Sequence, residues 1–480
     1  MATLQGNLPS DVRRPGVFNF FDDTSSARGQ IPIGRTVALL GMKHSSGVAT
    51  VNVPIEIVNE AAADLMFGTG SEMALMCRMA FKTFRFLSSR IKGTPAQVWG
   101  VPVVEPAGVA ATRTFTVTGT ATTNGDVIIR IAGREIRVPV ASGTTQNNVA
   151  TAINAAIGQR LFELPGTSGV ATNVVTFTYR HLGVNGNDLL STVQSVAGVT
   201  VVAATGATGT GVADIQPALD AMGSRDYRAI ATSNHAAQDV TDFGEQADST
   251  WAADIKKYRH MFLASTGTLG SATTLASPAN RKEILVVSFE GGRNLPGEIA
   301  ASVAAMTQSK ERPSYNYDKT ELPLYPTDDV NNYIAAELET ALLGGATPLE
   351  MTNTGGVRVN RLVTTKATLS GFAFENLRDY SVSATSAFYA VQVDAACSQE
   401  MAGRNVDGDL LADLKSRIYD VLKTGEDLKD LQNVDAHAAE LLVQVHPTIP
   451  TRIVTEIPTS IIPNAHQIDN TLRLFVEAPQ

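Results

Sequence analysis

Seven histidines are the side chains of this 480-residue chain best suited to metal binding or proton transfer. Their positions show no metal-ligand spacing, so the sequence predicts no metal site. His235 has a carboxylate, that of Asp239, at helical spacing, so the two side chains could share a helical face. The sequence places no nucleophile beside this pair, and we interpret it as a pair on the protein surface.

Known catalytic motifs are missing from the sequence. It contains no Walker motif, no Gly-x-Ser-x-Gly elbow and no His-Glu-x-x-His pair. Gly209-Thr210-Gly211 precedes a helix-like stretch, but it lacks the third glycine of a dinucleotide loop, and its threonine-rich setting is typical of a linker. Glu290-Gly291-Gly292-Arg293 is a turn with charged flanks. The sequence therefore predicts neither an enzyme nor a bound cofactor.

The bulk composition excludes two further classes. The net charge is -9 and the isoelectric point is about 5.4, which argues against nucleic acid as a partner because backbone binding needs clustered Lys and Arg. There is no run of about 20 apolar residues, so no membrane insertion is expected. Cys77 and Cys397 have no Cys-x-x-Cys partner and are predicted to be buried free thiols in a reducing compartment.

The elements that would position any site alternate between strands and helices in two separated stretches. Short apolar strands bounded by glycine, followed by helical spacing of apolar residues, are typical of a sheet covered by helices. The predicted strands are Arg35–Met42, Val53–Val58, Ala96–Val104, Tyr227–Thr232, Met261–Ala264 and Lys282–Phe289, and the predicted helices are Glu72–Ser88, Val240–Arg259 and Leu295–Ser309. We assign residues 31–105 and 206–345 to one discontinuous α/β core domain.

A β-rich stretch separates these two parts. Residues 106–205 are rich in Thr, Val and Gly, and Ala132-Gly133 is a hairpin signal between two alternating runs. The predicted strands are Thr114–Thr118, Asp126–Ile131, Arg134–Val140, Val174–Arg180 and Val199–Val202, with one helix at Gln146–Arg160. Glycine-rich segments on both sides resemble paired linkers, so we predict an inserted, sandwich-like domain.

Residues 346–457 are predicted to form an α+β C-terminal domain. Strands are expected in Val357–Leu369, a loop or turn at Phe372–Asp379 and a helix at Ser383–Met401. Asp409–Leu422 is the strongest amphipathic helix of the chain. Its outer face carries alternating charges, including Lys415, Arg417 and Lys423, and is either a solvated face or a docking face for a charged partner.

Both ends of the chain carry strand-like segments. In residues 1–30, a Pro15-Gly16 turn precedes the aromatic run Val17–Phe21, and no apolar stretch has the length of a signal peptide. In the last 33 residues, prolines separate two strand-like pieces, Arg452–Ile457 and Leu472–Glu477. Such strands either fold back onto their own domain or pair with another molecule. We define residues 1–30 and 458–480 as arms.

The order of these parts resembles the tail sheath proteins of Mu-like contractile-tailed phages over essentially the whole chain. The resemblance rests on the Pro15-Gly16-Val17 opening and on the insertion stretch His181–Asp188 (HLGVNGND), which is similar to a Gly-x-x-Gly-Asn signature of sheath insertions. It rests also on the order of α/β core, helix-bearing C-terminal domain and strand-bearing tail.

The resemblance implies a structural subunit that stacks as hexameric rings around a tail tube and contracts to drive the tube through the host envelope. It implies a subtilisin-like core without an active site, an outward insertion and a tube-facing C-terminal domain. The implied partners are the subunit itself, the tube, the baseplate and the tail terminator. The expected location is the virion tail, assembled in the host cytoplasm.

The resemblance also implies roles for individual residues. The arms would augment a sheet in neighbouring subunits through Val17, Phe18, Phe20, Phe21, Leu472, Leu474, Phe475 and Val476, and the tube would contact Lys415, Arg417 and Lys423. Two alternatives stay open: the sheath of a bacteriocin or secretion-type injection system, and a hydrolase with an accessory β-domain.

Overall fold

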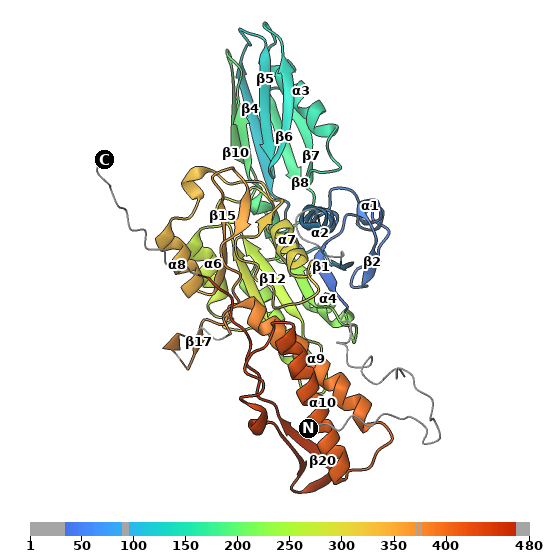
Figure 1. Ribbon diagram of the computed structural model, residues 1–480. Coiled ribbons are helices and arrows are strands. Elements are labelled where there is room, and N and C mark those ends of the chain that lie inside the picture. The colour runs from blue at the N-terminus through green and yellow to red at the C-terminus, as the bar shows by residue number, and fades with distance from the viewer. Residues whose placement is uncertain (1–33, 89–95, 371, 374–376, 467–480) are drawn as a thin grey trace, which may run out of the picture. The chain divides into compact units, whose positions relative to one another are not determined.

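The computed structural model describes residues 34–88, 96–370, 372–373 and 377–466 (Figure 1). The chain divides into two compact units. We call the first, which contains residues 34–387 and the returning segment from Pro463, the α/β unit, and the second, Phe388–Ile462, the helical unit. The predicted strands Val17–Phe21 and Leu472–Glu477 lie outside the described residues, and the predicted domain boundaries remain a prediction.

A nine-stranded sheet forms the centre of the α/β unit, in the order β14-β16-β15-β13-β12-β11-β1-β3-β2. The strands from β15 to β3 run parallel, and antiparallel strands complete both edges. All seven residues of β1 are buried, as expected for a strand covered on both faces. The strands are β1 (Thr36–Met42), β2 (Ile55–Ile57), β3 (Gln97–Val103), β11 (Ala229–Thr232), β12 (His260–Ser265), β13 (Ile284–Ser288), β14 (Glu321–Leu322), β15 (Ala346–Met351) and β16 (Val357–Val359).

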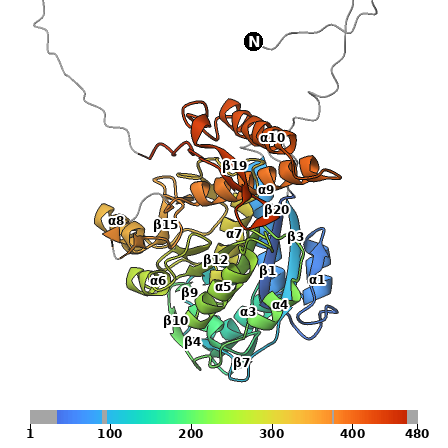
Figure 2. The same cartoon turned by 90° about the horizontal axis from the view of Figure 1, so that it is seen from below.

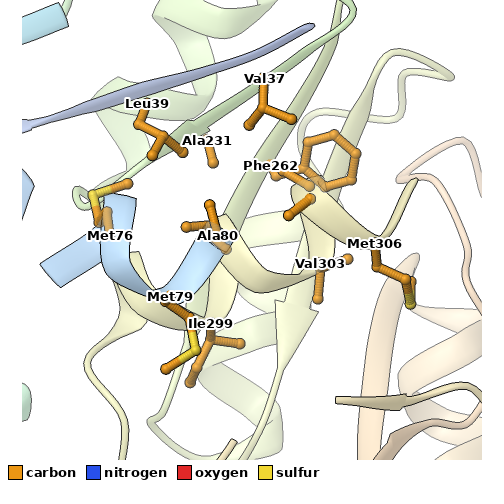
Figure 3. Close-up of a cluster of buried hydrophobic side chains, with 14 of the residues drawn as sticks. Val37, Leu39, Met76, Met79, Ala80, Ala231, Phe262, Ile299, Val303 and Met306 are labelled. Carbon is orange, nitrogen blue, oxygen red and sulfur yellow. The ribbon is translucent and has the colours of Figure 1, made fainter. Parts of the chain in front are cut away.

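Helices cover both faces of this sheet. On one face, α2 (Glu72–Ser88) and α7 (Pro296–Thr307) pack against Val37 and Leu39 of β1; Figure 3 shows this cluster with Met76, Ala80 and Val303. The alternate residues Ala38 and Leu40 pack on the other face with α4 (Gln216–Ala221), α5 (Ala237–Thr250) and α6 (Leu269–Ala276), which Figure 2 shows along that side. The unit also contains α1 (Glu60–Phe67) and α8 (Ala335–Leu343).

The predicted helix Val240–Arg259 is wrong at both ends. The structure places α5 at Ala237–Thr250 and leaves residues 251–259 as turns and irregular chain before β12. Lys256 has a φ of 55°, which no helix accommodates, and the Trp251 indole N–H donates to the Arg259 carbonyl at 2.9 Å. The local turn therefore overrides the helical spacing of the apolar residues.

Residues 112–205 form their own group of strands with one helix (Figure 1). Two sheets, β10-β4-β8-β7 and β6-β5-β9, share one apolar cluster with α3 (Gln146–Gly158). Ala132 and Gly133 both have positive φ, as the tight turn between β5 and β6 requires. The strands are β4 (Thr112–Gly119), β5 (Gly125–Ile131), β6 (Arg134–Val140), β7 (Gly166–Ala171), β8 (Val174–Tyr179), β9 (Ser191–Gln194) and β10 (Val199–Thr205). We call residues 112–205 the insertion.

The helical unit contains the later part of α9 (Tyr380–Met401), α10 (Gly408–Asp427) and a hairpin of β19 (Leu442–His446) and β20 (Ile449–Glu456). The Asp407 side chain accepts the Leu410 N–H and caps α10. The apolar stripe of α10 buries Leu414 and Ile418, but Leu411 and Val421 are only partly buried. The first tail piece, predicted at Arg452–Ile457, thus folds back within its own unit as β20.

Two smaller predictions need correction. Phe372–Ala373 is not a loop but strand β18, which pairs with β17 (Thr368–Leu369). Cys77 is a buried free thiol as predicted, whereas Cys397 is only partly buried. Within the described residues, no helix combines the length and the apolar character needed to cross a bilayer.

Candidate functional site

The carboxyl ends of β1 and β11 are where a sheet of this kind would hold a ligand. From β1 the chain continues to β3 on one side, and then returns to β11 on the other side of β1. A sheet whose strand order reverses in this way opens a crevice outside the carboxyl ends of the two strands. The residues that follow β11 are Ser233, Asn234 and His235, so any chemistry of the sheet is expected here.

A short segment of the insertion occupies this position. The 3₁₀ helix η2 (Val184–Asp188) presents Asn185, whose amide nitrogen donates to the Asn234 side-chain oxygen at 2.9 Å. The same nitrogen lies 3.3 Å from both carboxylate oxygens of Glu72, the first residue of α2. Tyr179 of β8 donates its hydroxyl to Glu72 at 2.8 Å. The insertion therefore fills, with its own side chains, the place where a ligand would bind.

His181 connects the same segment to the end of β3. Its ring is buried, and its Nε2 accepts the backbone N–H of Glu72 at 3.3 Å. The other ring nitrogen lies 3.5 Å from the Glu105 carboxylate, which also accepts the Leu182 N–H at 2.7 Å. The hydrogen bond from His181 lowers the pKa of Glu105 more than burial raises it. His181 thus connects the insertion to the first residue of α2 and to Glu105, which follows β3.

His235 and Asp239 do not form the surface pair that the sequence suggested. Asp239 is only 1% exposed, and its carboxylate accepts the Ala236 N–H at 2.7 Å and an amide N–H of Asn234 at 3.2 Å. His235 instead contacts the Asp188 carboxylate at 3.0 Å. Burial disfavours the charged ring, but hydrogen bonding and the charge of Asp188 outweigh burial and raise the pKa of His235. The histidine meets a carboxylate rather than a hydroxyl or thiol nucleophile.

The space left inside this network is small. A cavity of about 10 Å³ lies between the insertion and the sheet, enough for roughly one water molecule. It is lined by Glu72, Met76, Tyr179, Asn185, Ser233, Leu295, Pro296, Gly297 and Glu298. Such a cavity has no room for a substrate. The described part of the chain also brings together no group of three histidine, cysteine or carboxylate side chains placed to hold a metal ion.

The burial of the Asp239 carboxyl group should make the free energy of unfolding depend on pH. Burial raises the pKa of Asp239 to about 6 from an ordinary 3.8, so the folded chain holds this proton more tightly than the unfolded chain. The free energy of unfolding therefore falls as pH rises from about 4 to about 7, by about 3 kcal/mol from this group. Asp239→Asn should remove this fall, measured by urea unfolding at each pH, whereas Asp220→Asn, at an exposed position of α4, should leave it unchanged. If the free energy of unfolding showed the same pH dependence in wild type and Asp239→Asn, the predicted contribution of Asp239 would be contradicted.

A buried ion pair makes a second connection between the insertion and the sheet. Arg134 of β6 donates from both terminal nitrogens to the Glu298 carboxylate of α7, one of them at 2.9 Å. The two side chains are 8% and 2% exposed. Glu298 also accepts the Leu295 N–H at 3.1 Å and so caps α7, and the adjacent carboxylate raises the pKa of Arg134 despite its burial. Together with the network around Asn185, this pair attaches the insertion to α2, α7 and β11.

Sequence reasoning found part of this junction. The stretch His181–Asp188 was singled out by resemblance, and it lies at the centre of the network. The signal that could have found Arg134 is an arginine on the alternate, inward-facing register of a hairpin strand. Its partner Glu298 lies 164 residues away, and no pattern in one sequence connects the two.

The predicted tube-facing residues lie on α10 but differ in their surroundings. Lys415 is exposed. Lys423 is paired with the carboxylates of Glu426 and Asp435, the second at 3.1 Å, and these hydrogen bonds raise the pKa of Lys423. Arg417 has its Nε 4.0 Å from a Glu400 oxygen. The eight predicted strand-exchange residues lie outside the described residues, so their role remains a prediction.

Comparison with known proteins gives a consistent result. The chain matches no protein-family model. It is 32% identical over 190 residues to the Mu-like prophage FluMu tail sheath protein of Haemophilus influenzae, an alignment that covers 39% of this chain and only 37% of that relative. Its structure is similar to the sheath tail protein of Desulfitobacterium hafniense, with a TM-score of 0.53, 14% identity and coverage of 93% and 96% of the two chains.

Two further solved structures show the same likeness. The sheath tail protein of Listeria innocua matches with a TM-score of 0.53 and 14% identity over 92% of this chain and 95% of that one. The helical sheath of the anti-feeding prophage in its contracted state matches with a TM-score of 0.50 and 10% identity over 96% of this chain and 99% of that one. The chain is therefore similar over 190 residues to a Mu-like prophage tail sheath protein, and it has the mixed α/β fold of the sheath proteins of solved structure.

Proposed function

We propose that this protein is the structural subunit of a contractile phage tail sheath, which stacks as hexameric rings around a tail tube and contracts to drive the tube through the host envelope. The observation that carries the proposal is the match of more than nine-tenths of the chain to sheath subunits from several sources. Sequence similarity to a tail sheath protein supports it independently. The proposed location is the virion tail, after assembly in the host cytoplasm.

The subunit is proposed to be non-catalytic, with a core of the subtilisin-like type that the resemblance implies. The network around Asn185 and Glu72 supports this proposal, because it fills the crevice at the carboxyl ends of β1 and β11. A hydrolase would need that space for its substrate. The cavity of about 10 Å³ is far too small for one.

The hairpin of β19 and β20 supports strand exchange between subunits. An isolated two-stranded sheet is marginally stable, and its outer edges leave backbone N–H and C=O groups available for further strands. Within the described residues, β19 and β20 pair only with each other, and Leu442 and Ile449 are 45% and 43% exposed. We propose that Val17–Phe21 and Leu472–Glu477 of neighbouring copies add to these edges. The tube, the baseplate and the tail terminator are the other proposed partners.

A sheath of another contractile injection system is the second candidate. Solved structures of the anti-feeding prophage and of an extracellular contractile injection system share the fold at 10% and 11% identity. The Mu-like prophage relative at 32% identity favours a phage tail.

Negative-stain electron microscopy of the purified full-length protein tests the proposal. A sheath subunit is expected to form hollow sleeves or stacked rings on concentration, because its contracted assembly is more stable than the dispersed subunits. Only monomers, in the presence and absence of isolated tail tubes, would contradict the proposed function.

The tube contact is tested by charge reversal on α10. Lys415→Glu should impair assembly of extended sheaths on tubes at least tenfold, while self-assembly into sleeves without tubes continues, because the exposed Lys415 lies on the proposed tube-facing helix. Lys429→Glu, at another exposed lysine just after the helix, is the control. Counting extended tails by electron microscopy measures the effect. An equal number of extended tails from both variants would show that Lys415 is not part of the tube contact.

A further inference from the structure

Residues 463–466 return to the α/β unit and end in a histidine held between two carboxylates. The Nδ1 atom of His466 lies 2.5 Å from Asp318, and its Nε2 atom lies 2.8 Å from Asp379. The Asn464 amide donates to the Ser381 hydroxyl at 2.8 Å. We call Asn464 and His466, with these three partners, the C-terminal anchor.

Each of the two carboxylates is also held by a second contact within the α/β unit. Asp379 is 7% exposed, and its other oxygen accepts the Arg361 Nε–H at 2.9 Å. The other oxygen of Asp318 accepts the Leu362 N–H at 3.3 Å. Because residues 361 and 362 hold one oxygen of each carboxylate, the remaining two face the imidazole. Each ring nitrogen of His466 thus has one carboxylate oxygen as its partner.

The chain just before the anchor is fixed to the helical unit. Ile461 forms a β-bridge with Leu431, and the Ile462 N–H donates to the Asp430 carbonyl at 3.1 Å. Among the described residues, the backbone between Ile462 and His466 pairs with no strand; the Asn316 amide donates to the Ala465 carbonyl at 3.4 Å, and Pro463 and Ala465 are exposed. The anchor therefore depends on a few polar side-chain contacts, which are individually weak and separable from the fold of either unit.

We propose that the C-terminal anchor sets the length of the tether between the α/β unit and the strand Leu472–Glu477 when that strand pairs with a second copy of the chain. This inference rests on the proposed function. With the anchor closed, five residues separate His466 from Leu472, and the six steps between these two residues span at most about 22 Å. With the anchor open, the strand is tethered instead to Ile462 of the helical unit, and the ten steps from Ile462 to Leu472 span at most about 36 Å.

A short tether keeps the exchanged strand close to one place on the neighbour and so gives the assembly a uniform spacing. The local concentration of a tethered strand falls as the tether lengthens, and more arrangements become accessible. Opening the anchor is therefore expected to produce sleeves of uneven diameter. The anchor itself does not pair with the neighbour; it acts only by positioning the strand.

Closure of the anchor is tested in the free subunit. Ser381→Cys with Asn464→Cys, in a Cys397→Ser background, should form a disulfide under mild oxidation, detected by mass spectrometry. Adding His466→Ala should slow disulfide formation at least tenfold, whereas His437→Ala in the helical unit should not. If the double-cysteine protein forms no disulfide, or forms it equally fast without His466, the proposal that the anchor closes in the free subunit is overturned.

The length role is tested by assembly. The release variant Asn464→Ala/His466→Ala should at least double the spread of sleeve diameters in electron micrographs. Inserting Gly-Ser-Gly-Ser after His466, with the anchor intact, should have the same effect, and deleting residues 467–470 from the release variant should restore uniform sleeves. Uniform sleeves from the release variant, or no rescue by the deletion, would overturn the length role. If the wild type forms no sleeves at all, the proposed function fails, and the disulfide assay still decides whether the anchor closes.

Discussion

Arg134→Met is expected to lower the free energy of unfolding of the α/β unit by about 3–5 kcal/mol. The variant keeps the length of the side chain but leaves the Glu298 carboxylate, 2% exposed, without its cation. The Asn294 amide at 3.2 Å and the Leu295 N–H at 3.1 Å are the contacts that remain to that carboxylate. A buried charge held by two neutral donors is costly, because it loses the hydration that it has in the unfolded chain. Urea unfolding followed by circular dichroism measures the loss.

Two control variants separate the buried charge from other effects. Arg137→Met lies on the same strand, and its ion pair with Glu135 is exposed, so the loss should stay below about 1 kcal/mol. Arg134→Met/Glu298→Met removes both charges and should lose less than Arg134→Met alone, with about 1 kcal/mol remaining for the missing cap on α7. A double variant less stable than the single one would mean that the ion pair itself, rather than the unpaired charge, determines stability.

The alternation of strands and helices could be read from the sequence because local pattern determines it. β1, α2 and β3 were predicted within about one residue, since apolar runs and helical spacing carry the signal in a buried α/β sheet. β7 (Gly166–Ala171) was missed because its sequence, GTSGVA, has no alternation and contains only Val170 and Ala171 as apolar residues. Its pairing with β8 supplies the hydrogen bonds that local propensity does not.

The junction between insertion and sheet could be predicted only in part. The sequence drew attention to His181–Asp188 and to His235, and both lie in the network. It could not reveal that Glu72, at the start of an apolar helix, would meet Tyr179 and Asn185 more than 100 residues later. Contacts of this kind are set by where the insertion leaves and re-enters the sheet. His235 therefore contacts the insertion and belongs to this junction.

The predicted strand Leu472–Glu477 is proposed to pair with a neighbouring subunit, so its removal is the most decisive test of assembly. Deleting residues 472–480 is expected to leave a folded subunit, because the helices, strands and apolar clusters of both units are built from residues between 34 and 466. The deletion should reduce the polymerised fraction at least a hundredfold. Each subunit loses the strand that is proposed to join it to a neighbour, and one edge of the neighbour's sheet stays unfilled. Sedimentation of concentrated protein, with circular dichroism as a check of folding, measures both quantities.

The control is a shorter deletion. Removing residues 478–480 takes away the terminal proline but keeps Leu472–Glu477, so the polymerised fraction should match the wild type. Leu474→Asp/Val476→Asp keeps the full length and changes only one face of the predicted strand, and it should assemble as poorly as the longer deletion because a charged pair cannot pack on an apolar sheet face. Normal assembly by the 472–480 deletion would show that subunits are joined through their folded units alone. In that case the hairpin of β19 and β20 would need no incoming strand, and the segment that follows the C-terminal anchor would not take part in joining subunits.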